Sequence, residues 1–217
     1  CEKNPDEAYR VNAIGARNLA IETAAHECRL IQFSTDDVFD GRGTTPLNEF
    51  DRVDPISIYG KSKLAGEMMI QLLTNKFVII RSSWVYGTGH DFLDEVLKAA
   101  KEKKSISVSV DEKAVPTSAI ELARVISYFI ENDLFGLYHV VCQGSCSRYE
   151  YAKEIKEYAG LDLEIIPVTG TASNRPVYTV LDNMMLRLDG VEEPKEWKSA
   201  LHEYLDSIKV EGGYEID

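Results

Sequence analysis

Two short apolar runs, RLIQFS at residues 29–34 and FVII at residues 77–80, each follow a stretch with a helical pattern. The first helical pattern extends from Pro5 to about Glu27, and the second covers roughly residues 57–74. Continuously apolar strands that alternate with helices are typical of a parallel sheet covered on both faces. The sequence therefore predicts an α/β fold with a doubly wound parallel sheet, whose ligands bind beyond the carboxyl ends of the strands.

The alternation continues along the rest of the chain. We expect further helices near residues 91–102, 118–132, 147–159 and 195–208, and further strands near residues 105–109, 137–142 and 163–168.

The composition excludes several classes of protein. Of the 217 residues 44% are hydrophobic, which is enough for a packed core, and the formal net charge is −12. This charge argues against nucleic acid as the main partner, since phosphate binding needs clustered cations. No run of 18 apolar residues occurs, so no membrane-spanning helix is predicted.

The four cysteines do not form a disulfide framework. Cys142 and Cys146 have a C-x3-C spacing but no His pair follows, so we interpret them as buried thiols and predict no metal site. Free thiols fit a reducing compartment, and we expect a cytoplasmic protein.

A hydroxyl and a Tyr–Lys pair stand where the fold places chemistry. Thr35 follows the first strand; it either caps its own loop or contributes to a site. Tyr59 and Lys63 lie one turn apart on the next helix and face the same way. A phenol has a pKa near ~10, and a neighbouring ammonium lowers it, so the pair can exchange a proton with a carbonyl oxygen.

The Tyr–Lys spacing alone is a weak signal, because Tyr149 and Lys153 repeat it. Tyr59 differs in following a buried strand, a strand-end hydroxyl and a long loop. We therefore interpret Tyr149 and Lys153 as ordinary residues of a surface helix.

Three further residues have two interpretations each. Asn12 shares a helix face with Val11 and Gly15; it is either a satisfied core amide or the holder of a water that relays protons to Lys63. Trp84 either packs or stacks on a sugar or base. Arg175 either binds a phosphate or carboxylate or forms a structural ion pair.

Taken together, Asn12, Thr35, Tyr59 and Lys63 resemble the catalytic tetrad of the extended short-chain dehydrogenases/reductases. Five longer strings narrow the resemblance to the dTDP-4-dehydrorhamnose reductase family: VNAIGARNLA at 11–20, STDDVFDG at 34–41, YGKSKLAGE at 59–67, RSSWVYG at 81–87 and RPVYTVLDN at 175–183.

The resemblance implies an enzyme that uses NADPH or NADH to reduce a nucleotide-linked 4-keto-6-deoxy sugar, dTDP-4-dehydro-L-rhamnose, to dTDP-L-rhamnose. Tyr59 would protonate the ketone oxygen, and Thr35 would hydrogen-bond it. Lys63 would hold the nicotinamide ribose and depress the pKa of Tyr59. The expected partners are the nucleotide-sugar substrate and, in a homodimer, a second copy of the chain.

The same resemblance assigns the remaining site residues and the domains. Ser34 and Ser82 join Tyr59 and Lys63 in cofactor binding, and Thr35, Asp36, Val38, Trp84 and Arg175 contact substrate. A Rossmann-like dinucleotide-binding domain is expected at residues 1–86 and 117–145. A smaller α/β substrate domain is expected at residues 87–116 and 146–217, with the active site in the cleft between the two.

Three departures from the family stand out. Asp37 follows the STD triplet where the family usually has Tyr, and His90 and Asp91 precede Phe92 where the family tends to have Asn. No glycine-rich cofactor loop occurs in the 217 residues. We therefore expect that the chain lacks a first βαβαβ portion of roughly 60 residues or more, including N-terminal strands of the sheet. We also expect that by itself it binds nicotinamide nucleotide weakly or not at all and is poorly stable.

Two alternatives remain open at this stage. A sister nucleotide-sugar epimerase or dehydratase would share the tetrad but retain its cofactor between half-reactions. A regulatory binding subunit of the same fold would act by association without turnover. Net consumption of reduced cofactor separates the first alternative from a reductase, and the effect of Tyr59→Phe separates the second.

Overall fold

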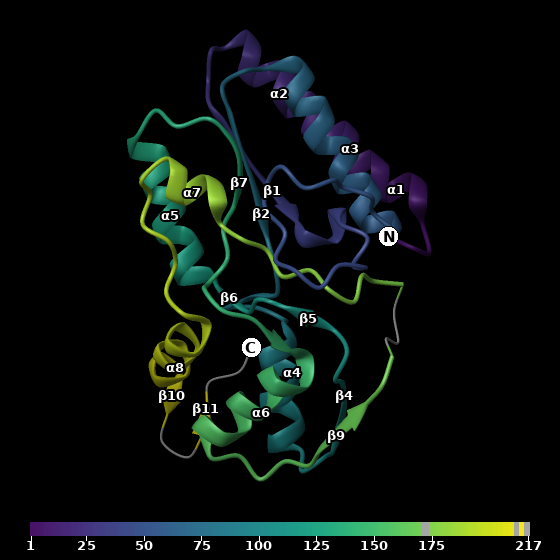
Figure 1. Ribbon diagram of the computed structural model, residues 1–217, viewed down its shortest axis with the longest axis vertical. Helices are drawn as coiled ribbons and strands as arrows, with labels where there is room; N and C mark the ends of the chain where they lie inside the picture. The colour runs from purple at the N-terminus through teal and green to yellow at the C-terminus, as the bar shows by residue number, and fades with distance from the viewer. Residues whose placement is uncertain (171–173, 211–212, 215–217) are drawn as a thin grey trace.

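The computed structural model describes residues 1–170, 174–210 and 213–214. Figure 1 shows an elongated molecule with an upper half around strands β1, β2 and β7 and a lower half that contains α4, α6 and α8. The helices are α1 (Pro5–Tyr9), α2 (Gly15–Ala25), α3 (Ile58–Leu73), α4 (Phe92–Lys101), α5 (Ala119–Glu131), α6 (Arg148–Ala159), α7 (Met184–Leu188) and α8 (Trp197–Ser207). The strands are β1 (Leu30–Thr35), β2 (Phe77–Ser82), β3 (Val85–Tyr86), β4 (Ile106–Ser109), β5 (Lys113–Ala114), β6 (Thr117–Ser118), β7 (Gly136–His139), β8 (Cys146–Ser147), β9 (Ile165–Val168), β10 (Lys209–Val210) and β11 (Gly213–Tyr214).

A parallel sheet with the order β1-β2-β7 forms the centre of the upper half. Val78, Ile79 and Ile80 of β2 are fully buried, which explains why this strand is a continuous apolar run. On one face Ile79 packs with apolar residues of α2 and α3, and on the other Val78 and Ile80 pack with those of α5 and α7. The predicted doubly wound parallel sheet is therefore confirmed (Figure 1).

The register of the sheet brings the two functional strand ends together. Thr35, the last residue of β1, pairs with Ser82, the last residue of β2. Both strands run in parallel, so the segments that leave them start at the same edge.

The first predicted helix contains a π-helical turn at Arg10–Ile14, between α1 and α2. A π turn inserts an extra residue and so rotates the buried face. The buried residues accordingly step by five from Ala8 to Ala13 and continue at Ala16 and Ala20. Val11, which the periodicity placed on the same face as Asn12, is instead exposed.

The lower half has its own apolar core. A parallel pair, β4 and β9, lies against α6, and α4 and α8 pack against the same helix. Leu93, Val96, Tyr151, Ile155 and Leu201 are almost completely buried there.

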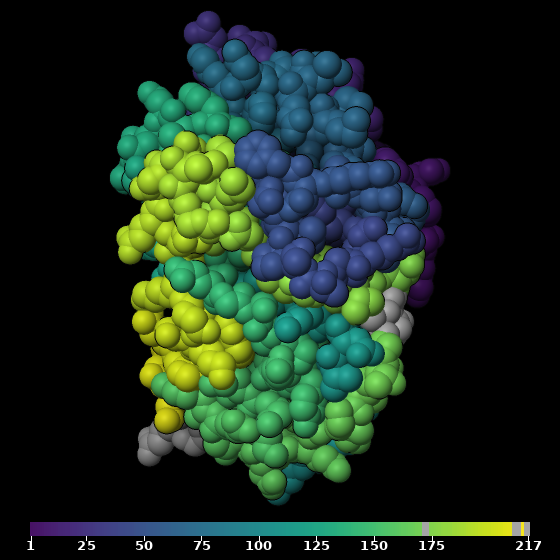
Figure 2. All heavy atoms as spheres, viewed as in Figure 1, coloured from purple at the N-terminus to yellow at the C-terminus, as the bar shows by residue number. Residues whose placement is uncertain are grey.

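The long loop between β1 and α3 connects the two halves. Leu47 of this loop forms an isolated parallel bridge with Leu181, in the segment that returns from the lower half. Figure 2 shows this loop, in blue, across the middle of the molecule beside residues of the later chain.

The predicted helices and strands are all present, and the elements that the sequence did not indicate are α7 and the two-residue strands. Such short elements carry too few residues for a periodic pattern. Cys142 and Cys146 are buried free thiols, as predicted, and Cys1 and Cys28 are exposed free thiols. No helix within the described part of the chain has the length and hydropathy to cross a membrane.

Candidate active site

A cavity of about 860 Å³ opens at the carboxyl ends of β1 and β2. Residues from the strand ends, from the start of α3 and from the lower half line it together. Its lining includes the predicted residues Ser34, Thr35, Asp36, Tyr59, Ser82, Trp84 and Arg175, and also Asp37, Phe92, Glu112 and Arg148. The sheet edge that the sequence singled out is therefore the wall of the cavity.

Tyr59 sits at the start of α3, directly over the loop that follows β1. Ser57 caps the helix by accepting a hydrogen bond from the Gly60 amide at 3.0 Å. A Cβ on Gly60 would lie 2.1 Å from the Asp37 carbonyl oxygen, so only glycine permits this close approach. The helix start is thereby held against the turn that carries Thr35 and Asp37.

The Tyr59 phenol forms a hydrogen bond with the Thr35 hydroxyl. Burial raises the pKa of Tyr59, the Thr35 hydrogen bond opposes that rise, and the charges of Asp37 and Asp36 add to it. The phenol therefore stays protonated at neutral pH and can act as a proton donor.

The predicted depression of the Tyr59 pKa by Lys63 remains a prediction. The Lys63 ammonium donates a hydrogen bond of 2.6 Å to the backbone carbonyl of Phe33, which directs it toward β1. Burial lowers the pKa of Lys63 itself, while the charge of Glu67 opposes that shift. Lys63 lines a second groove, of about 510 Å³, beside the main cavity.

Asn12 contacts Ser62. Its Nδ2 donates to Ser62 Oγ at 2.9 Å, and Ser62 Oγ donates to the backbone carbonyl of Tyr59, also at 2.9 Å. Asn12 thus supports the helix turn that carries Tyr59. It also lines the groove with Lys63, and the water relay between these two remains a prediction.

Asp36 holds other side chains in place. Its carboxylate accepts hydrogen bonds from the hydroxyls of Thr35 at 3.1 Å, Ser83 at 2.8 Å and Thr179 at 2.5 Å. These bonds fix Thr35 and connect the end of β1 to the segment around Thr179. Asp36 thus positions Thr35, and its predicted substrate contact remains a prediction.

The structure does not support the predicted substrate contact of Val38. The short 3-10 turn Asp36–Val38 directs its side chain into the apolar core, where it is fully buried, and it does not line the cavity. The two predicted serines do line the cavity, but Ser34 donates to the Glu67 carboxylate and Ser82 donates to the Val140 carbonyl at 2.8 Å. Both hydroxyl protons are used within the protein, and the cofactor contacts of these two serines remain a prediction.

Trp84 and Arg175 both line the cavity. The backbone of Trp84 has φ of 40°, in the left-handed region, and its indole stacks near the Tyr151 ring with centroids 6.4 Å apart. Arg175 Nε lies 3.4 Å from Asp37 Oδ2, so this arginine forms an ion pair at the cavity wall.

The second Tyr–Lys pair lies elsewhere, as predicted. Tyr149 and Lys153 are on α6, outside the residues that line the cavity. Lys153 Nζ is 6.0 Å from the Tyr149 ring centroid and 3.7 Å from Glu157. The pair is an ordinary feature of a surface helix.

Comparison with known proteins gives the family. The family model described as the RmlD substrate binding domain matches residues 1–210. The chain belongs to this RmlD family. The dTDP-4-dehydrorhamnose reductase of Escherichia coli is 33% identical over 225 residues, which cover 95% of this chain and 75% of the relative. The spore coat polysaccharide biosynthesis protein SpsK of Bacillus subtilis is 41% identical over 210 residues, which cover 94% of this chain and 74% of SpsK.

Two crystal structures of dTDP-4-dehydrorhamnose reductases resemble this RmlD-family chain closely. The one from Clostridium acetobutylicum superposes with a TM-score of 0.93 at 39% identity, covering 97% of this chain and 76% of that one. The one from Bacillus anthracis, in complex with NADP, gives a TM-score of 0.91 at 39% identity, covering 95% and 75%. The chain is an oxidoreductase of this family, and the resemblance stated from the sequence strings is confirmed.

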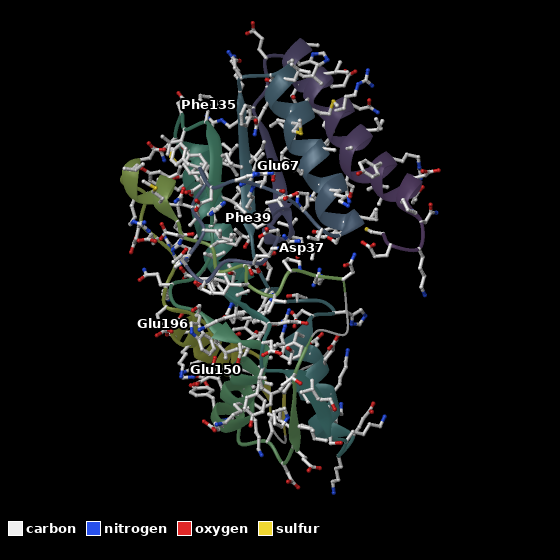
Figure 3. All side chains as sticks on the ribbon, turned by 45° about the vertical axis from the view of Figure 1, so that its right-hand side comes forward. Asp37, Phe39, Glu67, Phe135, Glu150 and Glu196 are labelled. Carbon is white, nitrogen blue, oxygen red and sulfur yellow. The ribbon has the colours of Figure 1, made fainter. Side chains whose placement is uncertain are left out.

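Two charged residues of this RmlD-family site were not assigned from the sequence. Asp37 was noted only as a departure from the family, and Arg148 was not noted at all. Asp37 is buried, and its Oδ2 accepts no hydrogen bond from the described residues. Figure 3 labels Asp37 near the middle of the molecule, where the two halves meet.

Asp37 is expected to make the stability of the protein depend on pH. Burial and the nearby charge of Asp36 raise its pKa from 3.8 to about 6, although Arg175 opposes the shift. A raised carboxyl pKa means that the folded state keeps the proton longer than the unfolded chain. Stability is therefore lost as pH rises from about 4 through about 6, by roughly 3 kcal/mol in total.

Asp37→Asn should remove this loss. We expect the variant to be more stable than the wild type by about 2–3 kcal/mol at pH 8, a Tm higher by roughly 5–10 °C, with little difference near pH 4. Arg175 loses its partner but is half-exposed, so this costs little. Thermal unfolding at the two pH values measures the effect, and Asp54→Asn at an exposed carboxylate is the control. An equal shift of Tm at both pH values would contradict the assignment.

Proposed function

We propose that the protein catalyses the NAD(P)H-dependent reduction of a nucleotide-linked 4-keto-6-deoxy sugar, dTDP-4-dehydro-L-rhamnose, to dTDP-L-rhamnose. The observation that carries the proposal is the hydrogen-bonded pair of Thr35 and Tyr59 in a cavity that Trp84 and Arg175 also line. Two hydroxyls in one cavity can hold and protonate a single ketone oxygen. The reductases among the relatives act on substrates of this class by name.

Different residues of the chain bind and protonate the ketone. Thr35 turns its hydroxyl from Asp36, 3.1 Å away, to hydrogen-bond the ketone oxygen. Tyr59 gives that oxygen a proton, since burial keeps the phenol protonated. Trp84 packs against the sugar ring. A bound nicotinamide would supply the hydride for the carbonyl carbon; with the proton from Tyr59, the ketone then gains two electrons and two protons in each turnover.

The groove that Lys63 lines would take the nicotinamide end of the cofactor. Lys63 uses one N–H on the Phe33 carbonyl, which leaves two ammonium donors for ribose hydroxyls. Asn12 and Gln32 line the same groove with polar side chains. We assign Lys63 to the cofactor ribose, and Asn12 to the support of Tyr59 through Ser62.

We also propose the division of the chain given by the sequence. Residues 1–86 and 117–145 would hold the cofactor, and residues 87–116 and 146–217 would hold most of the substrate. The cavity lining supports this division, because Thr35 and Tyr59 come from the first part and Glu112 and Arg148 from the second.

Turnover by the full-length protein tests the proposed function. We expect it to consume one NADPH or NADH per molecule of dTDP-4-dehydro-L-rhamnose, measured as loss of nicotinamide absorbance and as formation of dTDP-L-rhamnose. Conversion of the sugar without net loss of reduced cofactor would indicate an epimerase or dehydratase. A complex with another protein and no turnover would indicate the regulatory alternative.

A further inference from the structure

Arg148, at the start of α6, is stacked on aromatic rings at the cavity wall. Its Cζ lies 3.6 Å from the Trp84 ring centroid and 4.7 Å from that of Phe92. The side chain is 15% exposed, and it lines the same cavity as Thr35 and Tyr59. Contact with the ring faces leaves the N–H groups around the rim of the guanidinium for other partners.

These N–H donors have no hydrogen-bond acceptor among the described residues. The nearest carboxylate oxygen, of Glu112, is 4.0 Å from Nε, which is beyond hydrogen-bond distance. Burial lowers the pKa of Arg148, so its charge is incompletely compensated in the free protein. Arg148 therefore has Glu112 only as an ion partner at 4.0 Å, and its N–H groups lack an acceptor at the wall of the cavity.

A second guanidinium, of Arg175, is close enough to affect Arg148. The charge of Arg175 lowers the pKa of Arg148, since like charges disfavour each other. Two cations on one cavity wall are stabilised together when a ligand brings negative charge between them. The two aspartates nearby are already engaged: Asp36 accepts three hydroxyls, and Asp37 lies 3.4 Å from Arg175 as its ion partner.

Trp84, on whose ring Arg148 stacks, has a strained backbone conformation. Trp84 is a non-glycine residue at φ of 40°, in the left-handed region that side chains disfavour. Strain of this kind persists where the surrounding structure fixes a residue, and it is common at ligand sites. Here it holds the indole under the guanidinium, with Tyr151 on a further side.

We propose that Arg148, with Arg175, binds the diphosphate of the nucleotide-sugar substrate through charge-assisted hydrogen bonds. The identification of the ligand as a nucleotide sugar rests on the proposed function. The inference that Arg148 binds an anion is independent of it. Arg148 acts in this proposal as a binding residue with no part in proton or hydride transfer. A planar guanidinium suits two phosphate oxygens, whereas lysine offers only a point charge.

The test compares ligands that differ in phosphate. Binding of dTDP, thymidine and inorganic pyrophosphate to the full-length protein is measured by calorimetry or ligand-observed NMR for the wild type, Arg148→Gln and Arg148→Lys. We expect Arg148→Gln to weaken the binding of dTDP and of pyrophosphate about 10–100-fold, and the binding of thymidine less than twofold. Arg148→Lys should recover part of the loss. Arg52→Gln, which removes a positive charge at an exposed position, should leave the affinities for all three ligands unchanged.

Other outcomes overturn the inference. Equal weakening of thymidine and dTDP would mean that Arg148 only supports the ring cluster, and unchanged dTDP binding would mean that it does not touch the phosphates. A wild type that binds neither dTDP nor pyrophosphate also refutes it. Failure of the proposed function is seen separately, as absence of NADPH or NADH consumption by a wild type that still binds pyrophosphate through Arg148.

Discussion

Tyr59→Phe is expected to lower kcat about 10²–10⁴-fold in the full-length protein, with little change in the fold. The variant keeps the ring and removes only the hydroxyl that forms the hydrogen bond with Thr35. Because burial keeps the phenol protonated, we expect it to be the proton donor for the ketone oxygen. The other described tyrosines that line the cavity, Tyr86 and Tyr151, are almost completely buried. The rate of NADPH or NADH consumption at saturating substrate measures the effect.

Tyr149→Phe is a matched control for this experiment. Tyr149 has the same spacing to a lysine on α6 but lies outside the cavity lining, so its variant should turn over at the wild-type rate. Thermal unfolding of both variants verifies that they are folded. A Tyr59→Phe protein that keeps more than about a tenth of the wild-type kcat would rule out the role of the phenol as proton donor.

The fold and the centre of the site could be predicted because both depend on local pattern. Val78, Ile79 and Ile80 are buried on both faces, so their strand is recognisable as an apolar run. Thr35 and Tyr59 meet because a strand end and the start of the following helix lie at the same edge of a parallel sheet. Burial of the strand and topology of the sheet are sufficient for these two features.

The remaining features depend on contacts that spacing does not encode. Arg148 is brought to Trp84 and Phe92 by packing of distant segments, and no motif marks it. The hydrogen bond of Lys63 to the Phe33 carbonyl depends on the position of α3 over β1. The outward position of Val11 depends on the π turn, which periodicity at 3.6 residues cannot anticipate.

A buried ion pair connects the helix that carries Tyr59 and Lys63 to both strand ends. Arg81 Nε and Nη2 donate to the two oxygens of Glu67 at 3.0 and 2.6 Å, and Ser34 donates to the same carboxylate. The side chains of Arg81 and Glu67 are 4% and 2% exposed. Figure 3 labels Glu67 in the upper half, on α3, one turn beyond Lys63.

Arg81→Met is expected to destabilise the protein by about 3–5 kcal/mol, because it leaves the Glu67 charge buried without its partner. Removing both charges should cost much less: Arg81→Met combined with Glu67→Leu should lose only about 1 kcal/mol, since two apolar groups avoid the penalty of an unpaired ion. Chemical denaturation of the wild type, both single variants and the double variant measures the coupling.

An exposed arginine that also donates to both oxygens of one carboxylate separates the effect of burial from that of the bond itself. Arg187 donates to both oxygens of Asp182 at 2.9 and 2.7 Å, but these side chains are 45% and 33% exposed. Arg187→Met should therefore cost no more than about 1 kcal/mol. If Arg81→Met also cost no more than about 1 kcal/mol, water would have to reach Glu67. The ion pair would then not be the contact that holds α3 over the ends of β1 and β2. If it is severe and kcat falls in the surviving folded fraction, the pair positions the Tyr59 helix as well as stabilising it.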